Sequence, residues 1–327
     1  MRVRLLFIVY ASAVGIWRAA AQDLDPSGRL SAACIEFNQR IVDKLESGQL
    51  AEAEAAFSDT TIGNESNFGQ SCAWLTLSNR ARVIYMSGRF IEAELLAQQS
   101  LRIVDKLYSP NDPIRVHPLQ LLWSVQLQQG KLGKARQTIQ SMRTLPLDKP
   151  LDRAMLHGAT AAQLQAEGRY KEAEPEYLRA LAATDEVGRR ETPGAATLLV
   201  GLATSQLVQD RYLDADRTLD RALAIVNSAQ DTIPMDRVKF LGVRAALYAR
   251  QGKWQAAGED LRSAISLADR DTRLDPAELK TLLLNYVYVL RKTHRKKEAR
   301  SVEARAAAIH GPALRNAIVD VTELVSK

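Results

Sequence analysis

A seven-fold internal repeat constrains the fold of this 327-residue chain more than any other feature of its sequence. In every copy an alanine follows a turn-forming residue by five positions, and successive alanines lie 38 to 42 residues apart. The alanines are Ala53, Ala93, Ala135, Ala173, Ala215, Ala257 and Ala299. The turn positions are Gly48, Gly88, Gly130, Gly168, Asp210, Gly252 and His294. Glycine suits a tight turn between two helices because it adopts positive φ without a Cβ clash.

Each copy is predicted to form a helical hairpin. A large residue two positions after most turns would fill the junction between two antiparallel helices: Leu50, Phe90, Leu132, Tyr170, Tyr212 and Trp254. Five copies also have a proline 17 or 18 residues before the turn, where a first helix would begin: Pro113, Pro150, Pro193, Pro234 and Pro276. Apolar residues recur with a period near 3.6 on both sides of the turn. We therefore expect an all-α fold, an α-solenoid of about seven stacked antiparallel helix pairs.

These residues resemble the tetratricopeptide repeat (TPR) family, most closely its long, kinesin-light-chain type with a period near 42. Small first-helix residues match at Ala81, Ala161, Ala203 and Ala245, and second-helix pairs match at Tyr177 with Ala180, Leu219 with Ala222, and Leu261 with Ala264. The resemblance implies a TPR solenoid over residues 22–310 and a role in protein interaction. Lys296 and Glu303 depart from the pattern, as does the polar stretch 59–70, and we interpret these departures as end caps. Trp123 replaces an alanine, which indicates either altered packing or an exposed anchor.

The two ends of the chain differ from the repeats. Residues 1–21 combine a basic start, an apolar run of 13 residues and the sequence Ala19-Ala20-Ala21, which predicts a cleaved secretory signal, with an uncleaved anchor as the alternative. The mature chain is then expected to be periplasmic or secreted and to lack an integral membrane segment. The tail 311–327 is rich in β-branched residues and is expected either to fray or to dock on the repeats as an extended segment.

The only two cysteines lie at similar heights on the first helices of neighbouring hairpins. Cys34 and Cys72 precede their turn glycines by 14 and 16 residues. In an exported protein this placement favours a disulfide. The alternative is a pair of buried thiols whose Cβ atoms point apart.

The sequence contains no recognisable catalytic, metal-binding or cofactor-binding pattern. Its four histidines have no metal-ligand spacing, and no phosphate-cradling or nucleophile motif is present. We expect no enzyme activity, no cofactor and no metal. The net charge of +6 falls to +3 without residues 1–21, and basic clusters interleaved with aromatic residues are absent, which argues against nucleic acid as a partner.

Function is therefore expected to depend on the surface of the array. The favoured hypothesis is an exported scaffold that binds a protein or an extended peptide in a concave groove lined by the first helices. Carrying over the family's groove positions selects Asn79, Arg82, Tyr85, Gln120, Ser124, Gln165, Lys239, Arg250, Asn285, Tyr288, Arg291 and Lys292. The alternative is a structural subunit of an envelope assembly that associates with copies of itself through the ends of its array.

Overall fold

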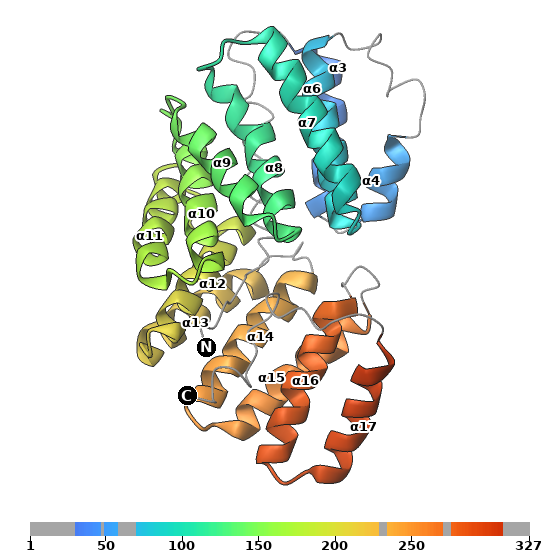
Figure 1. The fold of residues 1–327 in the computed structure, drawn as a ribbon, viewed down its shortest axis with the longest axis vertical. Helices are drawn as coiled ribbons and strands as arrows, with labels where there is room; N and C mark the ends of the chain where they lie inside the picture. The colour runs from blue at the N-terminus through green and yellow to red at the C-terminus, as the bar shows by residue number, and fades with distance from the viewer. Residues whose placement is uncertain (1–29, 47–48, 58–69, 229–233, 271–275, 310–327) are drawn as a thin grey trace. The chain divides into compact units, whose positions relative to one another are not determined.

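A computed structural model describes residues 30–46, 49–57, 70–228, 234–270 and 276–309 (Figure 1). Within these ranges the chain forms fourteen α-helices and one short 3-10 helix, with no strand. The predicted all-α fold is confirmed. The proposed signal sequence, the turn residue Gly48 and the tail 311–327 lie outside the described residues.

The helices follow one another as seven hairpins. Hairpin 1 is α3 (Ala32–Glu46) with α4 (Leu50–Ala56), hairpin 2 is α6 (Gln70–Met86) with α7 (Phe90–Leu107), and hairpin 3 is α8 (Val116–Gln128) with α9 (Leu132–Arg143). Hairpin 4 is α10 (Pro150–Ala166) with α11 (Tyr170–Glu186), and hairpin 5 is α12 (Pro193–Val208) with α13 (Tyr212–Ser228). Hairpin 6 is α14 (Pro234–Arg250) with α15 (Trp254–Ala268), and hairpin 7 is α16 (Pro276–Lys292) with α17 (Lys296–Ala308).

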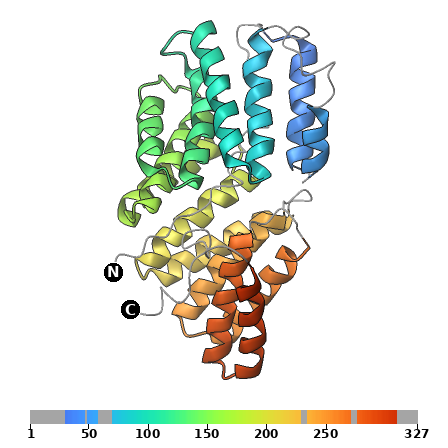
Figure 2. The same ribbon diagram turned by 45° about the vertical axis from the view of Figure 1, so that its right-hand side comes forward.

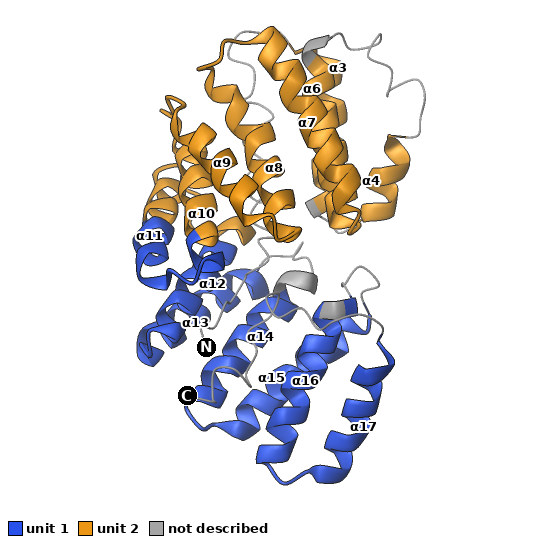
Figure 3. Cartoon of the chain, viewed as in Figure 1, with its two compact units in different colours: residues 1–8, 164–178, 196–327 blue, residues 9–163, 179–195 orange. Residues whose placement is uncertain are grey.

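The chain divides into two compact units (Figure 3). The amino-terminal unit contains the described residues up to 163 together with residues 179–195, and the carboxy-terminal unit contains residues 164–178 and the described residues from 196 onward. In the amino-terminal unit, first helix packs on first helix, with α6 contacting both α3 and α8. In the carboxy-terminal unit, α14 contacts α13 and α15, and α16 contacts α15 and α17.

The turns have the geometry that the repeat predicts. All six described turn positions have positive φ, including the non-glycine residues Asp210 and His294, each at +60°. The residue after each turn donates its backbone N–H to the carbonyl five residues earlier, as in Arg89 to Ile84 at 3.1 Å and Arg295 to Leu290 at 2.9 Å. This is the hydrogen bond of the Schellman motif, which ends one helix and redirects the chain.

All seven repeated alanines and four of the five prolines occupy their predicted places. All seven alanines are buried, with exposed fractions of 0 to 2%, so a small side chain allows helices to approach closely at each hairpin. Pro150, Pro193, Pro234 and Pro276 begin their helices. Pro113 instead opens the 3-10 helix η1 (Pro113–Arg115), because Pro118 lacks the N–H that would bond the Ile114 carbonyl.

Candidate functional site

The twelve residues predicted to line a groove lie on five first helices, and they differ sharply in exposure. Seven of them are at most 4% exposed: Asn79, Arg82, Tyr85, Gln120, Ser124, Gln165 and Asn285. These seven side chains are buried in the structure, and their role in lining a groove stays a prediction. The five accessible or half-buried members all belong to the carboxy-terminal unit: Lys239, Arg250, Tyr288, Arg291 and Lys292.

In the amino-terminal unit the buried members form a polar network between α3 and α6. Asn79 Nδ2 donates to Asn38 Oδ1 at 2.8 Å, and Arg82 Nη1 donates to Asn79 Oδ1 at 3.1 Å. Asn38 Nδ2 in turn donates to the Cys34 carbonyl at 3.0 Å and to Thr76 Oγ1 at 3.2 Å. Burial lowers the pKa of Arg82 to about 9. A buried polar group that loses its hydrogen bond destabilises the fold, so these bonds favour the one relative position of α3 and α6 in which they form.

The two cysteines lie at the same helix contact. Cys34 on α3 and Cys72 on α6 form a disulfide with a Cα–Cα distance of 6.0 Å. Both are at most 1% exposed and pack with Leu30, Trp74 and Val104. The bond closes a loop between residues 38 positions apart, which ties hairpin 1 to hairpin 2.

The next buried members are packing residues of α8. Ser124 Oγ donates to the Gln120 carbonyl one turn earlier, at 2.9 Å. Trp123 is 0% exposed, and its Nε1 donates to Gln163 Oε1 at 3.3 Å. Of the two interpretations of Trp123, the structure favours altered packing because no part of the ring reaches solvent.

In the carboxy-terminal unit Gln165 joins three helices. Its Nε2 donates to the Gly201 carbonyl at 2.6 Å and to Ser205 Oγ at 2.8 Å, while Tyr177 Oη donates to Gln165 Oε1 at 2.6 Å. A Cβ added to Gly201 would lie 2.3 Å from Tyr177 Cζ. The repeat pattern identified Tyr177 as a packing residue but did not identify Gly201, whose only signal was a glycine inside a helix.

Two basic candidates stack on aromatic residues of the preceding hairpin. The Arg250 guanidinium lies 5.8 Å from the centre of the Tyr212 ring and also contacts Asp210. Lys292 Nζ lies 5.6 Å from the centre of the Trp254 ring. The two pairs share the same repeat positions. The cation lies two residues before the turn of its own hairpin, and the aromatic residue lies two residues after the turn of the preceding hairpin. We call these contacts the cation–aromatic rungs, and they show that Arg250 and Lys292 help to join consecutive hairpins.

A second set of contacts between hairpins was also missed. The residue after the turn is basic in six hairpins: Arg89, Lys131, Arg169, Arg211, Lys253 and Arg295. Three of these pair with a glutamate of the preceding hairpin, in Arg89–Glu54, Lys131–Glu94 and Arg211–Glu174. The signal that the sequence offers for these pairs is the recurrence of a basic residue one position after the turn and of a glutamate six positions after it.

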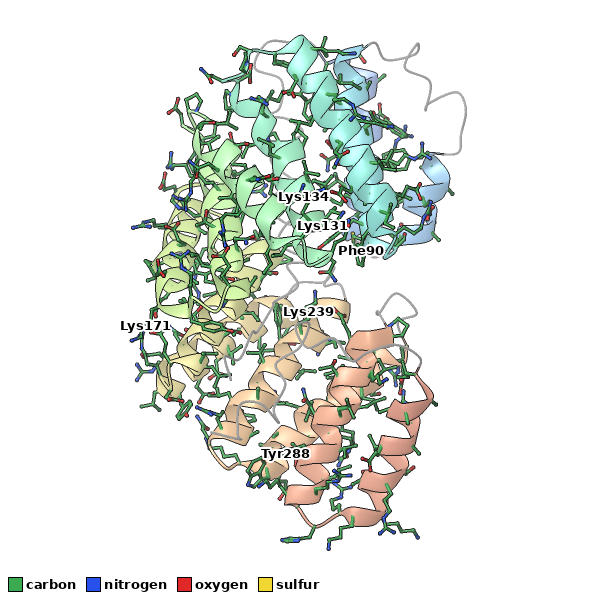
Figure 4. The ribbon with its side chains drawn as sticks, in the orientation of Figure 1. Phe90, Lys131, Lys134, Lys171, Lys239 and Tyr288 are labelled. Atoms are coloured by element: carbon green, nitrogen blue, oxygen red, sulfur yellow. A yellow bond between two sulfur atoms is a disulfide. The ribbon has the colours of Figure 1, made fainter. Side chains whose placement is uncertain are left out.

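The accessible candidates lie on α14 and α16, with Lys239 near the start of α14 and Tyr288, Arg291 and Lys292 near the end of α16. Figure 4 labels Lys239 on α14 and Tyr288 on α16. Arg291 is exposed and pairs with Glu303 at 2.7 Å, while the Tyr288 ring packs edge-on against Trp254 at 6.0 Å. We call Lys239, Tyr288, Arg291 and Lys292 the basic face of the carboxy-terminal unit.

The structure also places a histidine near a carboxylate. His117 Nε2 lies 3.9 Å from Asp152 Oδ1, and these residues are only 6% and 5% exposed. Burial, with the positive charges of Arg82 and Lys149, lowers the pKa of His117 to about 3, so its imidazole is neutral at pH 7. The pair is therefore almost closed off from solvent in the structure. Among the described residues no group of three or more His, Cys, Asp or Glu could hold a metal ion.

The membrane prediction concerns helix length and polarity. None of the helices that the structure describes combines the length and the apolar character needed to cross a bilayer.

Comparison with known proteins identifies the fold. No family model matches the sequence, and no curated protein does. The chain is similar to a Rap protein solved in complex with a competence and sporulation factor, at 16% identity, 89% of this chain, 77% of that chain and a TM-score of 0.62. It is also similar to BtubC (BKLC) from P. vanneervenii, at 19% identity, 70% of this chain, 96% of that chain and a TM-score of 0.52. The fold is a stack of TPR-like hairpins.

A third similar structure shows how far this likeness extends. Aspartyl phosphate phosphatase F from Bacillus subtilis matches at 10% identity over 94% of this chain and 96% of that chain, with a TM-score of 0.50. One of these three proteins is named as an enzyme, and another was solved in a complex. TPR-like repeats therefore define the architecture here, while activity must be argued from this chain's own residues.

Proposed function

We propose that this chain is an exported, non-enzymatic scaffold that binds a protein or an extended peptide through the basic face of its carboxy-terminal unit. The observation that carries the proposal is the distribution of exposure among the candidate residues. Those in the amino-terminal unit are buried, whereas Lys239, Tyr288, Arg291 and Lys292 remain half-buried or exposed. Their charge favours an acidic partner segment.

Two further observations support parts of this proposal. The structurally similar Rap protein was solved with a bound factor, which makes a ligand on helical hairpins of this kind a reasonable model. The Cys34–Cys72 disulfide supports export, because disulfides persist mainly in oxidising compartments. Mass measurement of the protein isolated from its host tests export, and we expect residues 1–21 to be missing.

The binding surface is tested by crosslinking and pull-down from the fraction that contains the protein. The variant Lys239→Glu with Arg291→Glu reverses two charges on the basic face. The matched control, Lys134→Glu with Lys171→Glu, reverses two exposed charges on second helices (Figure 4). We expect the first variant to lose its partner and the control to keep it, at equal thermal stability. Retention of the partner by both variants would refute the basic face as the binding surface.

A second candidate function is self-association as a structural subunit. It is favoured by Ile91 and Leu95, which lie one turn apart on α7 and are 76% and 54% exposed. Large apolar side chains so exposed are frequent at protein contacts. Crosslinks confined to copies of this chain, abolished by Ile91→Ser with Leu95→Ser, would support this function over the first.

A further inference from the structure

The positive charge of the chain is concentrated in one short segment. Residues 291–300 read Arg-Lys-Thr-His-Arg-Lys-Lys-Glu-Ala-Arg, so six basic residues face one glutamate and the segment carries +5. The whole chain carries +6. All other residues together are therefore almost neutral. We call residues 291–300 the cationic tip.

The cationic tip is the turn of hairpin 7. Helix α16 ends at Lys292 and α17 begins at Lys296, and the turn joins the adjacent ends of these two helices (Figures 1 and 2). All six of its Lys and Arg residues are exposed. Arg291 pairs with Glu303 and Arg295 with Glu298. Lys296, Lys297 and Arg300 have no carboxylate within 4.0 Å among the residues that the structure describes.

Aromatic residues adjoin the cationic tip. Lys292 Nζ lies 5.4 Å from the centre of the Tyr288 ring and 5.6 Å from that of Trp254, and the two rings contact each other at 6.0 Å. Tyr and Trp with a neighbouring Lys or Arg are the residue types enriched where proteins meet the interface of a bilayer. Lys292 lies over both rings, the two rings meet edge-on, and both residues are half-buried.

We propose that the cationic tip docks the protein on the surface of an anionic phospholipid bilayer. The turn presents exposed Lys and Arg residues from two helix ends. Each Lys or Arg close to an anionic bilayer adds to the electrostatic attraction between the protein and the lipid headgroups. Half-buried Trp254 and Tyr288 supply apolar contact at the headgroup level. This inference goes beyond the proposed scaffold, because it assigns hairpin 7 a peripheral membrane contact that needs no protein partner.

Vesicle flotation tests the docking. The protein in the form isolated from cells is mixed with vesicles of phosphatidylcholine alone or with added phosphatidylglycerol. The tip variant carries Lys296→Glu, Lys297→Glu and Arg300→Glu, and the control carries Lys106→Glu, Lys134→Glu and Lys171→Glu, all at exposed positions. Both triple variants change the net charge by the same amount and have the same amino terminus. A difference in their vesicle binding is therefore due to the cationic tip.

We expect binding to the phosphatidylglycerol vesicles and little to phosphatidylcholine, with the tip variant binding at least ten-fold more weakly and the control close to the unchanged protein. Binding should also fall steeply as salt rises. Equal loss in both variants, equal binding to both vesicle types, or retention by single-stranded DNA without vesicle binding would each overturn the proposal. Circular dichroism and thermal unfolding verify that the tip variant is folded. Partner capture depends on Lys239 and Arg291 and is measured separately, so the two proposals can fail independently.

Discussion

At the scale of the residue, two turns place a residue with a Cβ in a backbone conformation that usually requires glycine. Asp210 and His294 adopt the left-handed conformation that glycine adopts at the other described turns. This conformation costs a residue with a Cβ about 1 to 2 kcal/mol. Asp210 offsets part of that cost through its carboxylate, which accepts a hydrogen bond from Tyr212 Oη at 2.6 Å and contacts Arg250.

Replacing His294 by glycine should therefore stabilise the protein. We expect His294→Gly to raise the free energy of unfolding by about 1 kcal/mol, as measured by urea denaturation. Asp210→Gly should yield a smaller gain, because it also removes the contacts with Tyr212 and Arg250. A lower stability of His294→Gly would show that the imidazole makes a stronger contribution than the backbone strain it introduces.

At Gly201 the requirement for glycine is steric, because the Tyr177 ring leaves no room for a side chain. Gly201→Ala would place a methyl group against the Tyr177 ring, and we expect a loss of about 1 to 3 kcal/mol in urea denaturation. Gly133→Ala is the matched control: nothing lies within 4 Å of its added Cβ, so this substitution should not destabilise the protein. Similar effects of the two substitutions would contradict the packing argument.

Buried His117 predicts a loss of stability in acid. Its pKa is about 3 in the folded chain, against 6.5 for an ordinary histidine, because burial disfavours the imidazolium. Below pH 6.5 the unfolded chain takes up a proton that the folded chain does not. The free energy of unfolding should therefore fall by about 2 kcal/mol between pH 6.5 and 5. His117→Gln should flatten this part of the pH profile measured by chemical denaturation, and an unchanged profile would contradict the role of His117.

At the scale of the element, consecutive hairpins are joined by contacts that recur with the repeat. The cation–aromatic rungs join hairpin 5 to hairpin 6 and hairpin 6 to hairpin 7, and ion pairs such as Arg211–Glu174 join hairpin 4 to hairpin 5. The helix boundaries could be predicted because turn, proline and alanine positions act locally. The rungs could not, because they depend on how one hairpin rotates against the next.

Arg250 and Arg291 test the difference between a rung and a surface ion pair. We expect Arg250→Ala to lower the free energy of unfolding by about 1 to 2 kcal/mol, because its guanidinium is mostly buried against Tyr212. Arg291→Ala should change it by less than about 0.5 kcal/mol, since its pair with Glu303 is exposed. Thermal denaturation of both variants gives the comparison, and equal losses would argue against the rung.

At the scale of the whole molecule, the two units differ in the crosslinks, buried polar networks and charged surfaces that they contain. The disulfide and the Asn38–Asn79–Arg82 network lie in the amino-terminal unit, whereas the basic face and the cationic tip lie in the carboxy-terminal unit. Because each hairpin contacts mainly its neighbours, a change in one unit should remain local. The disulfide thus lies in one unit and the surfaces proposed for binding lie in the other.

Reduction of the disulfide should therefore act locally. We expect a loss of about 2 to 4 kcal/mol, seen by hydrogen exchange as faster exchange in α3 and α6, with protection in α14 to α17 unchanged. The double variant Cys34→Ala with Cys72→Ala serves as the control, and the reductant should have no further effect on it. A uniform rise in exchange across both units would contradict local coupling.

The sequence by itself determined the repeat, the turn positions, the buried alanines and hence the all-α class. These features depend on interactions between residues close in the sequence, and the same local pattern recurs in every copy of the repeat. The tertiary structure alone decided which polar residues are accessible. Asn79, Arg82, Gln120 and Gln165 are polar residues of the kinds found on binding surfaces, yet each is at most 4% exposed. Burial is a property of the contacts between hairpins, and those contacts are set by packing over many residues rather than by any one of them.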